Sequence, residues 1–547
     1  MVKQYQYSEP PSVNILQKEI EIKSRYISIP IRNGAEKRRM KILVNGETTR
    51  EFELFLADDS PISLYAVDYH VFIDIYELKG QNILLQVEQT PGGNPDVLDS
   101  VTQTDEIKDR EQFYSEKLRP QFHFSARRGW INDPNGLVFY KGEYHLFFQH
   151  NPYGCQHGNT HWGHAVSHDL IHWTELQPAL YPKCYGDWVF SGSAAVDWHN
   201  TGRFKTDDEH VLVAAYTSTG RGECIAYSNN RGRTWRQFDK NPVLVHKGRD
   251  PRFFWHQPIQ QWGMAVYDEI DHKPTIAFYS SNDLKNWNYH SRMEGFYEFP
   301  ELFELMVDNN PGNQKWVLMA ADGDYAVGTF DGFQFIKESG KHRGNYGNCF
   351  CASQTWSDIP QTDGRRIQIA WAKIDMPAMP FNQMMTFPCS LHLVTTADGV
   401  RLAYRPVREI EAIYKERYCW ESQSLEPGKN LLTDISGELF DIAVELEPGT
   451  ARQFGFNIRN IPIICNWEKK QLSCLDCTAS LNTIDGTIRI RILVDRTSIE
   501  IFGNDGIVYM PIGTILPHNN RSLSIFTAGG YVSIRHLEVR TLNSIWP

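Results

Sequence analysis

The chain has 547 residues, of which 41% are hydrophobic and 22% charged, and its formal net charge is −11 at pH 7. This composition is globular and excludes a disordered tail. The acidic balance argues against a surface for nucleic acids or anionic membranes, and no apolar run approaches the roughly 18 residues of a membrane-spanning helix. The length predicts about three to four domains.

The amino-terminal end and the cysteines say little about compartment. Residues 1–6 contain no apolar core of a secretory signal. The compartment is therefore left open between the periplasm or secretion, if a leader is removed, and the cytoplasm. The ten cysteines are scattered along the chain and are predicted to be buried, reduced and structural. Cys474 and Cys477 form a single CxxC without a second pair, which is weak support for zinc.

Residues 1–115 are predicted to form a small antiparallel β-domain and a linker. Residues 71–76 and 83–87 alternate or run apolar as strands do. Asn-Gly pairs at 33–34 and 45–46 indicate hairpin turns between such runs.

Residues 116–415 contain a repeat. A polar turn ending in Trp occurs at residues 167–173, 228–235 and 281–287, so that the three Trp residues are 62 and 52 residues apart. Each copy follows a strand-like run, which is typical of propeller blades with four strands. The alternative is three coincidental turns rich in Ser, Asn and Asp.

Residues 416–547 show strands at even spacing. The run 488–494 alternates Ile and Arg before an apolar end, and the region is predicted to be a β-sandwich. No long amphipathic helix is expected anywhere, so the fold class is all-β.

Three acidic motifs, residues 130–136, 248–252 and 297–303, hold Asp133, Asp250 and Glu298 next to Pro or Gly. Glycoside hydrolysis needs one ionised carboxylate and one carboxylic acid that keeps its proton near neutral pH. Arg249 is expected to keep Asp250 ionised, and the apolar neighbours of Glu298 are expected to raise its pKa. Taken singly, the motifs also fit an Asx-turn, a surface ion pair and a strand-end Glu.

These motifs resemble those of a known family, glycoside hydrolase family 32, and the resemblance covers about residues 118–547. Residues 123–125 lead into the specific signature Trp-Ile-Asn-Asp-Pro-Asn-Gly at 130–136. The other matching segments follow in the same order: residues 149–152, 162–165, 190–193, 249–251 and 493–502.

The resemblance implies a five-bladed β-propeller followed by a carboxy-terminal β-sandwich, and a retaining mechanism on β-fructofuranosides without metal or cofactor. It makes Asp133 the nucleophile, Glu298 the general acid/base and Asp250 the stabiliser of the transition state. The substrate-binding residues it implies are Asn132, Gln149, His157, Phe190, Ser191, Arg249, Tyr346 and Trp371.

The sequence departs from the family pattern at several positions. Glu-Phe-Pro-Glu at 298–301 replaces Glu-Cys-Pro-Asp, and Glu298 rather than Glu301 aligns with the acid/base. His157 stands where the family has a Trp wall, and Cys349 and Cys351 stand at an Asp and a Tyr position. These changes predict a roomier or differently polar fructose pocket.

Two other interpretations of the same region are weaker. A metal site formed by His150, His157, His161 and His164 lacks accompanying carboxylates. Cysteine nucleophiles at 349 and 351 lack a positioned base.

The predicted function is a fructan exo-hydrolase that releases terminal fructose from levan, inulin, fructo-oligosaccharides or sucrose. By analogy the amino-terminal domain is interpreted as a carbohydrate-binding or packing module. The alternatives are a fructosyltransferase with the same covalent intermediate and a fructan-binding protein that has lost catalysis. No nucleic-acid partner and no membrane insertion are expected, and the oligomeric state is left open.

Overall fold

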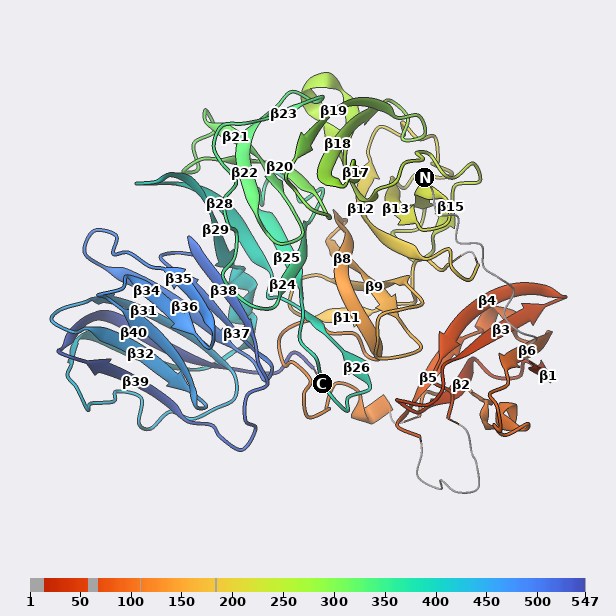
Figure 1. The fold of residues 1–547 in the computed structure, drawn as a ribbon, viewed down its shortest axis with the longest axis horizontal. Coiled ribbons are helices and arrows are strands. Elements are labelled where there is room, and N and C mark those ends of the chain that lie inside the picture. Colours follow the sequence, from red (N-terminus) through yellow and green to blue (C-terminus); the bar gives the residue numbers. More distant parts are fainter. Residues whose placement is uncertain (1–13, 58–66, 109, 183, 547) are drawn as a thin grey trace.

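The structure is a computed structural model that describes residues 14–57, 67–108, 110–182 and 184–546. It is all-β, as predicted, and the only helices among the described residues are short 3-10 turns. Figure 1 shows three bodies: an amino-terminal β-domain in red, a propeller from orange to teal, and a sandwich in blue. The five-bladed propeller and the sandwich predicted from the sequence are confirmed.

The amino-terminal domain packs two sheets around its own core. One sheet has the order β1 (Ile15–Glu21), β6 (Asn82–Glu88), β3 (Arg38–Val44) and β4 (Glu47–Leu54); the other has β5 (Tyr69–Asp74), β2 (Tyr26–Ile31) and β7 (Thr102–Thr104). Asn45 and Gly46, with φ of 51° and 83°, form the predicted hairpin turn between β3 and β4. The pair at 33–34 instead joins β2 to β3, which lie in different sheets, so it is not a hairpin.

The propeller has five blades, and each blade is an antiparallel sheet whose strands follow in chain order. Blade 1 is β8 (Gly129–Tyr140), β9 (Glu143–Asn151), β10 (His161–Ser167) and β11 (Trp173–Glu175); blade 2 is β12 (Val189–Asp197), β13 (Val211–Ser218), β14 (Gly222–Ser228) and β15 (Arg236–Gln237). Blade 3 is β16 (Arg249–His256), β17 (Gln261–Ile270), β18 (Lys273–Ser281) and β19 (Asn288–Glu294); blade 4 is β20 (Glu301–Met306), β21 (Gln314–Met319), β22 (Tyr325–Phe330) and β23 (Phe335–Lys337). Blade 5 is β24 (Phe350–Thr355), β25 (Arg366–Ala372), β28 (Cys389–Thr396) and β29 (Gly399–Pro406), and β27 (Met384–Met385) pairs with β25.

The first strand of each blade faces the propeller axis. β12 lies against both β8 and β16, and β24 lies against β8, so the ring closes between blades 5 and 1. The short strand β26 (Phe381–Asn382) also crosses from blade 5 and pairs in parallel with β8. Residues at the start of these first strands are therefore brought to one end of the axis, whatever their separation in sequence.

The repeated Trp turns join the third and fourth strands of blades 1 to 3. In each turn the indole N–H donates to the backbone carbonyl three residues earlier, at 3.0–3.1 Å. The donor and acceptor pairs are Trp173 with Leu170, Trp235 with Gly232, and Trp287 with Leu284. The sequence repeat is thus a structural repeat of the blade and not a coincidence.

The sandwich consists of a six-stranded and a five-stranded sheet. The first is β30 (Tyr414–Leu425), β40 (Val532–Leu542), β31 (Phe440–Glu447), β36 (Ile488–Val494), β37 (Ser498–Gly503) and β38 (Val508–Gly513). The second is β35 (Cys477–Ser480), β34 (Gln471–Cys474), β33 (Ile461–Asn466), β32 (Gln453–Ile458) and β39 (Leu523–Ala528). In β36 the Ile side chains are buried and the Arg side chains half-buried, as the alternation predicted.

A buried ion-pair cluster joins the propeller to the sandwich. His123 lies 2.7 Å from Asp495 and 2.9 Å from Glu500, both of which belong to the sandwich segment 493–502. Burial alone would lower the pKa of His123, but the hydrogen bonds to the two carboxylates raise it to about 9. Two segments that carry the family resemblance therefore meet in one structural contact.

The cysteines follow the prediction in part. All ten are unpaired, and five of them are buried: Cys224, Cys349, Cys389, Cys465 and Cys474. Cys184 and Cys419 are exposed, contrary to the prediction. Cys474 and Cys477 face each other across the turn between β34 and β35.

Candidate active site

The first strands of the blades share an irregular backbone at the same end. A β-bulge or register shift interrupts pairing near the start of β8, β12, β16 and β24. In blade 4, Glu298 and Phe299 have φ of 54° and 47° directly before β20. Bulges re-aim side chains at strand ends. Blades 1 to 4 carry Asp133, Ser191, Asp250 and Glu298, respectively, in these irregular segments.

Asp133 lies within β8, next to the start of blade 2. Its Oδ2 accepts a 2.7 Å hydrogen bond from Ser191 Oγ, and Asn132 also donates to it. Burial raises the pKa of Asp133, while these hydrogen bonds and the nearby His157 oppose that rise.

Asp250 is the second residue of β16. It has a left-handed backbone, at φ 66°, and is only 7% exposed. Burial and then the charge of Asp133 raise the pKa of Asp250 to about 8. The expectation that Arg249 keeps Asp250 ionised is therefore wrong: its Nε lies 3.8 Å from Asp250 Oδ2 and does not offset burial. The coupling also places Asp133 and Asp250 in one site, as the sequence alone could not.

Arg249 points instead to Glu298, whose carboxylate it contacts. The adjacent Phe299 N–H lies 3.4 Å from Asp250 Oδ2, so that blades 3 and 4 meet at these two acids. The Glu298 side chain is 29% exposed, whereas that of Glu301 is fully buried against Arg252. The geometry thus favours Glu298 over Glu301 as the group that reaches a ligand.

Of the other residues expected to bind substrate, three lie close to the acids and one, Gln149, lies behind the start of β12. Ser191 lies against Asp133, and His157 and Arg249 lie close to the acids. Gln149 is buried, and its Nε2 donates to the Val189 carbonyl at 3.1 Å, which holds the start of β12 next to Phe190.

Trp130 was not predicted as a site residue. Its indole N–H donates to Asn132 Oδ1 at 3.1 Å, and its ring packs edge-on to Trp371 at 6.2 Å between centroids. Lys373 lies 4.8 Å from the centroid of the Trp371 ring. Trp130 precedes the acid by three residues in the same motif, so its position in that motif was the only available signal.

Two expected pocket residues lie elsewhere. The Tyr346 ring packs against the core of the sandwich, and its N–H donates to the Tyr509 carbonyl at 2.8 Å. Cys349 is buried at the same junction, with Sγ 3.3 Å from the Pro511 carbonyl oxygen. The sandwich covers this part of blade 5, so these residues are corrected from substrate contacts to interface contacts.

Cys351, by contrast, belongs to the candidate site. Burial and the charge of Asp133 raise the pKa of its thiol to about 11, which disfavours a thiolate nucleophile.

A buried polar chain lies behind Asp250 and was not predicted either. The Asp250 N–H donates to Thr217 Oγ1 at 2.9 Å, and that hydroxyl lies 2.9 Å from a Glu223 carboxylate oxygen. Glu223 in turn lies 2.8 Å from His246 Nε2. These residues fall on blade 2 and the loop before blade 3, and no sequence motif marks them.

The four histidines proposed as an alternative metal site do not converge. His150 and His161 each face a backbone carbonyl, and His164 lies 3.0 Å from His145. Burial lowers the pKa of these three side chains. His157 is exposed and lies beside Asp133 instead.

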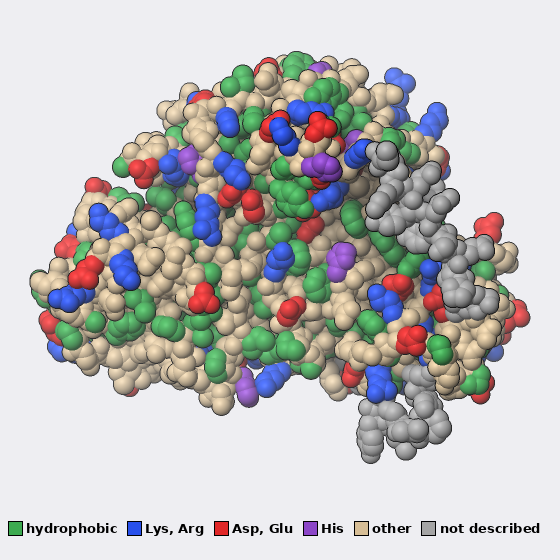
Figure 2. All heavy atoms as spheres, viewed as in Figure 1, with side chains coloured by type: hydrophobic (Ala, Val, Ile, Leu, Met, Phe, Trp, Pro, Cys, Tyr) green, Lys and Arg blue, Asp and Glu red, His purple; other side chains and the backbone are tan. Residues whose placement is uncertain are grey.

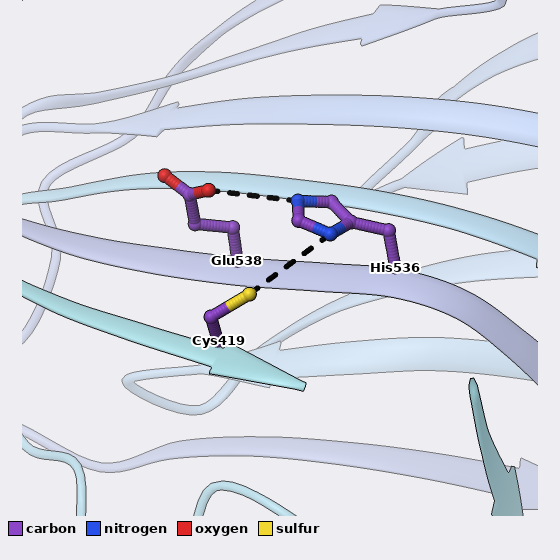
Figure 3. A group of neighbouring side chains, drawn as sticks. All are labelled: Cys419, His536 and Glu538. Carbon is purple, nitrogen blue, oxygen red and sulfur yellow. Dashed lines mark hydrogen bonds and ion pairs between the residues drawn. The ribbon is translucent and has the colours of Figure 1, made fainter. Parts of the chain in front are cut away.

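Among the described residues, one cluster has the spacing of a metal site: Cys419, His536 and Glu538 on the sandwich (Figure 3). Both Glu538 oxygens already accept hydrogen bonds or ion pairs from Arg417 and Arg540. The two guanidinium groups neutralise the Glu538 carboxylate, so its charge is not free to bind a cation.

The surface fits the charge argument made from the sequence. Figure 2 shows acidic and basic side chains interspersed over the visible face. Within the described part of the chain, no helix is both long and apolar enough to cross a membrane.

Comparison with known proteins places the chain in a family. The profile of the glycosyl hydrolases family 32 N-terminal domain matches residues 123–406, and that of the family's C-terminal domain matches residues 409–541. A levanase of Bacillus subtilis is 37% identical over 491 residues, which covers 79% of this chain and 72% of the levanase. An extracellular exo-inulinase of Aspergillus ficuum is 29% identical over 521 residues, which covers 79% of this chain and 96% of the exo-inulinase.

A solved structure agrees with these sequence matches. The exo-inulinase of Aspergillus awamori has a TM-score of 0.73 at 26% identity, and the match covers 79% of this chain and 100% of that chain. The two profiles together match well over half of the sequence, so this chain belongs to glycosyl hydrolase family 32.

Proposed function

We propose that this protein is a retaining β-fructofuranosidase that removes terminal β-D-fructofuranosyl residues from fructans or smaller fructosides. One observation carries the proposal: three blades bring Asp133, Asp250 and Glu298 to the same end of the propeller axis, where the first two are electrostatically coupled. The printed names of the relatives, levanase and exo-inulinase, favour a fructan as the substrate.

The two coupled aspartates supply different protonation states. Because the pKa of Asp250 is raised to about 8, it keeps its proton at neutral pH. Asp133 can then remain ionised without a second negative charge beside it. Asp133, held by Ser191 Oγ, attacks the anomeric carbon, and a fructosyl ester forms as the bond to the leaving oxygen breaks.

Glu298 handles the leaving group. In the free protein the contact with Arg249 favours the ionised carboxylate of Glu298. As the acid in the substrate complex, Glu298 gives a proton to the departing oxygen in the first step; as the base it takes one from water in the second, so that the ester is hydrolysed with net retention. Asp250 accepts and donates hydrogen bonds to the fructose hydroxyls, whose acidity grows as positive charge develops on the ring.

The proposal also assigns the surroundings of the terminal fructose. Asn132, Gln149, Phe190, Ser191 and Arg249 form its polar and apolar contacts, with Trp371 and His157 at the sides. Trp130 joins them, since it orients Asn132.

The test is fructose release from sucrose, short fructo-oligosaccharides, inulin and levan by the wild type and by Asp133→Asn. We expect the wild type to release fructose from at least one fructan and the variant to lose activity by about a thousandfold or more. Products longer than the substrate would favour a fructosyltransferase. Binding without turnover by the wild type would favour a fructan-binding protein and contradict the proposal.

A further inference from the structure

The propeller loop that carries His157 packs partly into the core of the amino-terminal domain. The Tyr153 ring stacks on Phe52 of β4 with centroids 3.8 Å apart and is buried in the core of that domain. Two residues later, Cys155 Sγ lies 3.3 Å from the Tyr69 hydroxyl, which belongs to β5. A propeller loop thus supplies side chains to the core of another domain.

The same strand β4 also holds the far end of this loop. The Glu53 N–H donates to Asn159 Oδ1 at 2.8 Å, and Asn159 Nδ2 donates to the Glu53 carbonyl at 2.7 Å. Asn159 Nδ2 also lies 3.0 Å from Asn151 Oδ1. Since Tyr153 and Asn159 are both fixed by neighbouring residues of β4, His157 lies on a short segment tied at both ends.

A second loop at the site rests on the same strand. The Tyr185 hydroxyl contacts the Glu53 carboxylate, and the Arg39 guanidinium of β3 lies 3.9 Å from the centroid of the Tyr185 ring. The Tyr185 ring packs edge-on to Trp188. Two residues after Trp188, β12 carries Phe190 directly before Ser191, which contacts Asp133.

We infer that β4 of the amino-terminal domain is a positioning element for the substrate site: through Phe52 and Glu53 it fixes the His157 loop and the Tyr185–Trp188 loop, and so sets affinity for the terminal fructose and the sugar adjoining it. The rings of Tyr185 and Trp188 are half-buried and so can contact the face of a sugar. The inference rests on the proposed function. Both family profiles begin after this domain, so the role lies outside the matched region.

Two variants loosen these contacts without changing Asp133, Asp250 or Glu298. Asn159→Asp keeps the acceptor for the Glu53 N–H but removes the two donated hydrogen bonds, and Tyr185→Phe removes only the contact with Glu53. The matched control is Lys18→Ala. Lys18 lies on β1, at the opposite edge of the same sheet, and the substitution removes its ion pair with Asp99. Steady-state kinetics on a fructo-oligosaccharide are compared with amide hydrogen exchange of residues 151–160.

We expect KM for the oligosaccharide to rise about 3- to 10-fold in both variants, because one or two hydrogen bonds that hold the loops are lost, with kcat within about twofold. Exchange of residues 151–160 should accelerate in Asn159→Asp and stay unchanged in Lys18→Ala. Unchanged KM in both variants, or the same change in the control, would overturn the inference. If the wild type cleaves no fructoside, the proposed function fails, and the exchange result still decides whether β4 holds the loop.

Discussion

Arg249, at the start of the third blade, contacts the carboxylate of Glu298, which precedes the first strand of the fourth. The guanidinium thereby links the proposed proton donor to the blade that carries Asp250. Asp250 and Glu298 could not adopt these positions in a regular strand, since both have left-handed backbones. Residues in such uncommon backbone conformations cluster at active sites and ligand-binding sites.

Glu298→Gln should slow the reaction according to the leaving group. The amide cannot donate a proton to the departing oxygen, so kcat on sucrose or a fructan should fall by about a thousandfold or more. An aryl fructoside, whose phenol leaves without protonation, should lose far less. Equal losses on both substrates would argue that Glu298 binds substrate rather than acting as the acid.

Asp250→Asn should abolish most activity and stabilise the fold. The folded-state pKa of Asp250, about 8, lies above its ordinary value of 3.8. The native state therefore binds this proton more tightly than the unfolded chain, and stability falls as pH rises from about 4 through 8. Thermal unfolding should show a gain of about 1–4 kcal/mol at pH 8.5 and little at pH 4. A variant less stable than the wild type at pH 8.5 would contradict this assignment.

The junction between propeller and sandwich should weaken at alkaline pH. The pKa of His123 is raised from 6.5 to about 9, so its ion pairs with Asp495 and Glu500 contribute fully below about pH 6.5 and are lost as pH rises through 9. Calorimetry should show a difference of about 1–3 kcal/mol between wild type and His123→Gln that shrinks between pH 7 and 9.5. A difference independent of pH would mean that His123 is neutral in the native state.

Because His157 stands where the family has a Trp, we expect a preference for substrates longer than sucrose. A His covers less of the fructose ring than the family's Trp, so binding should depend more on the sugars beyond it. Cys349 no longer supports this argument, because it is buried at the sandwich junction, whereas Cys351 and His157 remain beside Asp133.

His157→Trp should improve kcat/KM for sucrose about 2- to 10-fold relative to an oligosaccharide, the effect of one aromatic contact. A wild type that already prefers sucrose to every oligomer would show that neighbouring groups compensate for the replacement.

The sequence predicted the architecture well because its signals repeat. The Trp turns recur in three blades with the same hydrogen bond, and the alternation at 488–494 matches the burial of β36. Local periodicity is sufficient for such elements, since each depends on its own few residues. The motifs identified Asp133, Asp250 and Glu298 as candidate acids but did not show where they lie in the fold.

What the sequence could not predict depends on distant contacts. The raised pKa of Asp250 needs the charge of Asp133, from another blade, as well as burial. Tyr346 faces the sandwich because a domain that begins some 70 residues later covers it. The hold of β4 on Asn159 likewise joins residues 106 positions apart.

The anomeric configuration of the azide products tests the central claim, that Asp133 is the nucleophile and Glu298 the acid/base, most directly. In Asp133→Ala, azide should replace the carboxylate on the α face and give an α-fructosyl azide from a β-fructoside. In Glu298→Ala, azide should attack the fructosyl ester and give the β-fructosyl azide with retention. NMR of the two products decides the matter: α from the first variant and β from the second is the predicted result, and the reverse assignment, or no azide product from either, would contradict it.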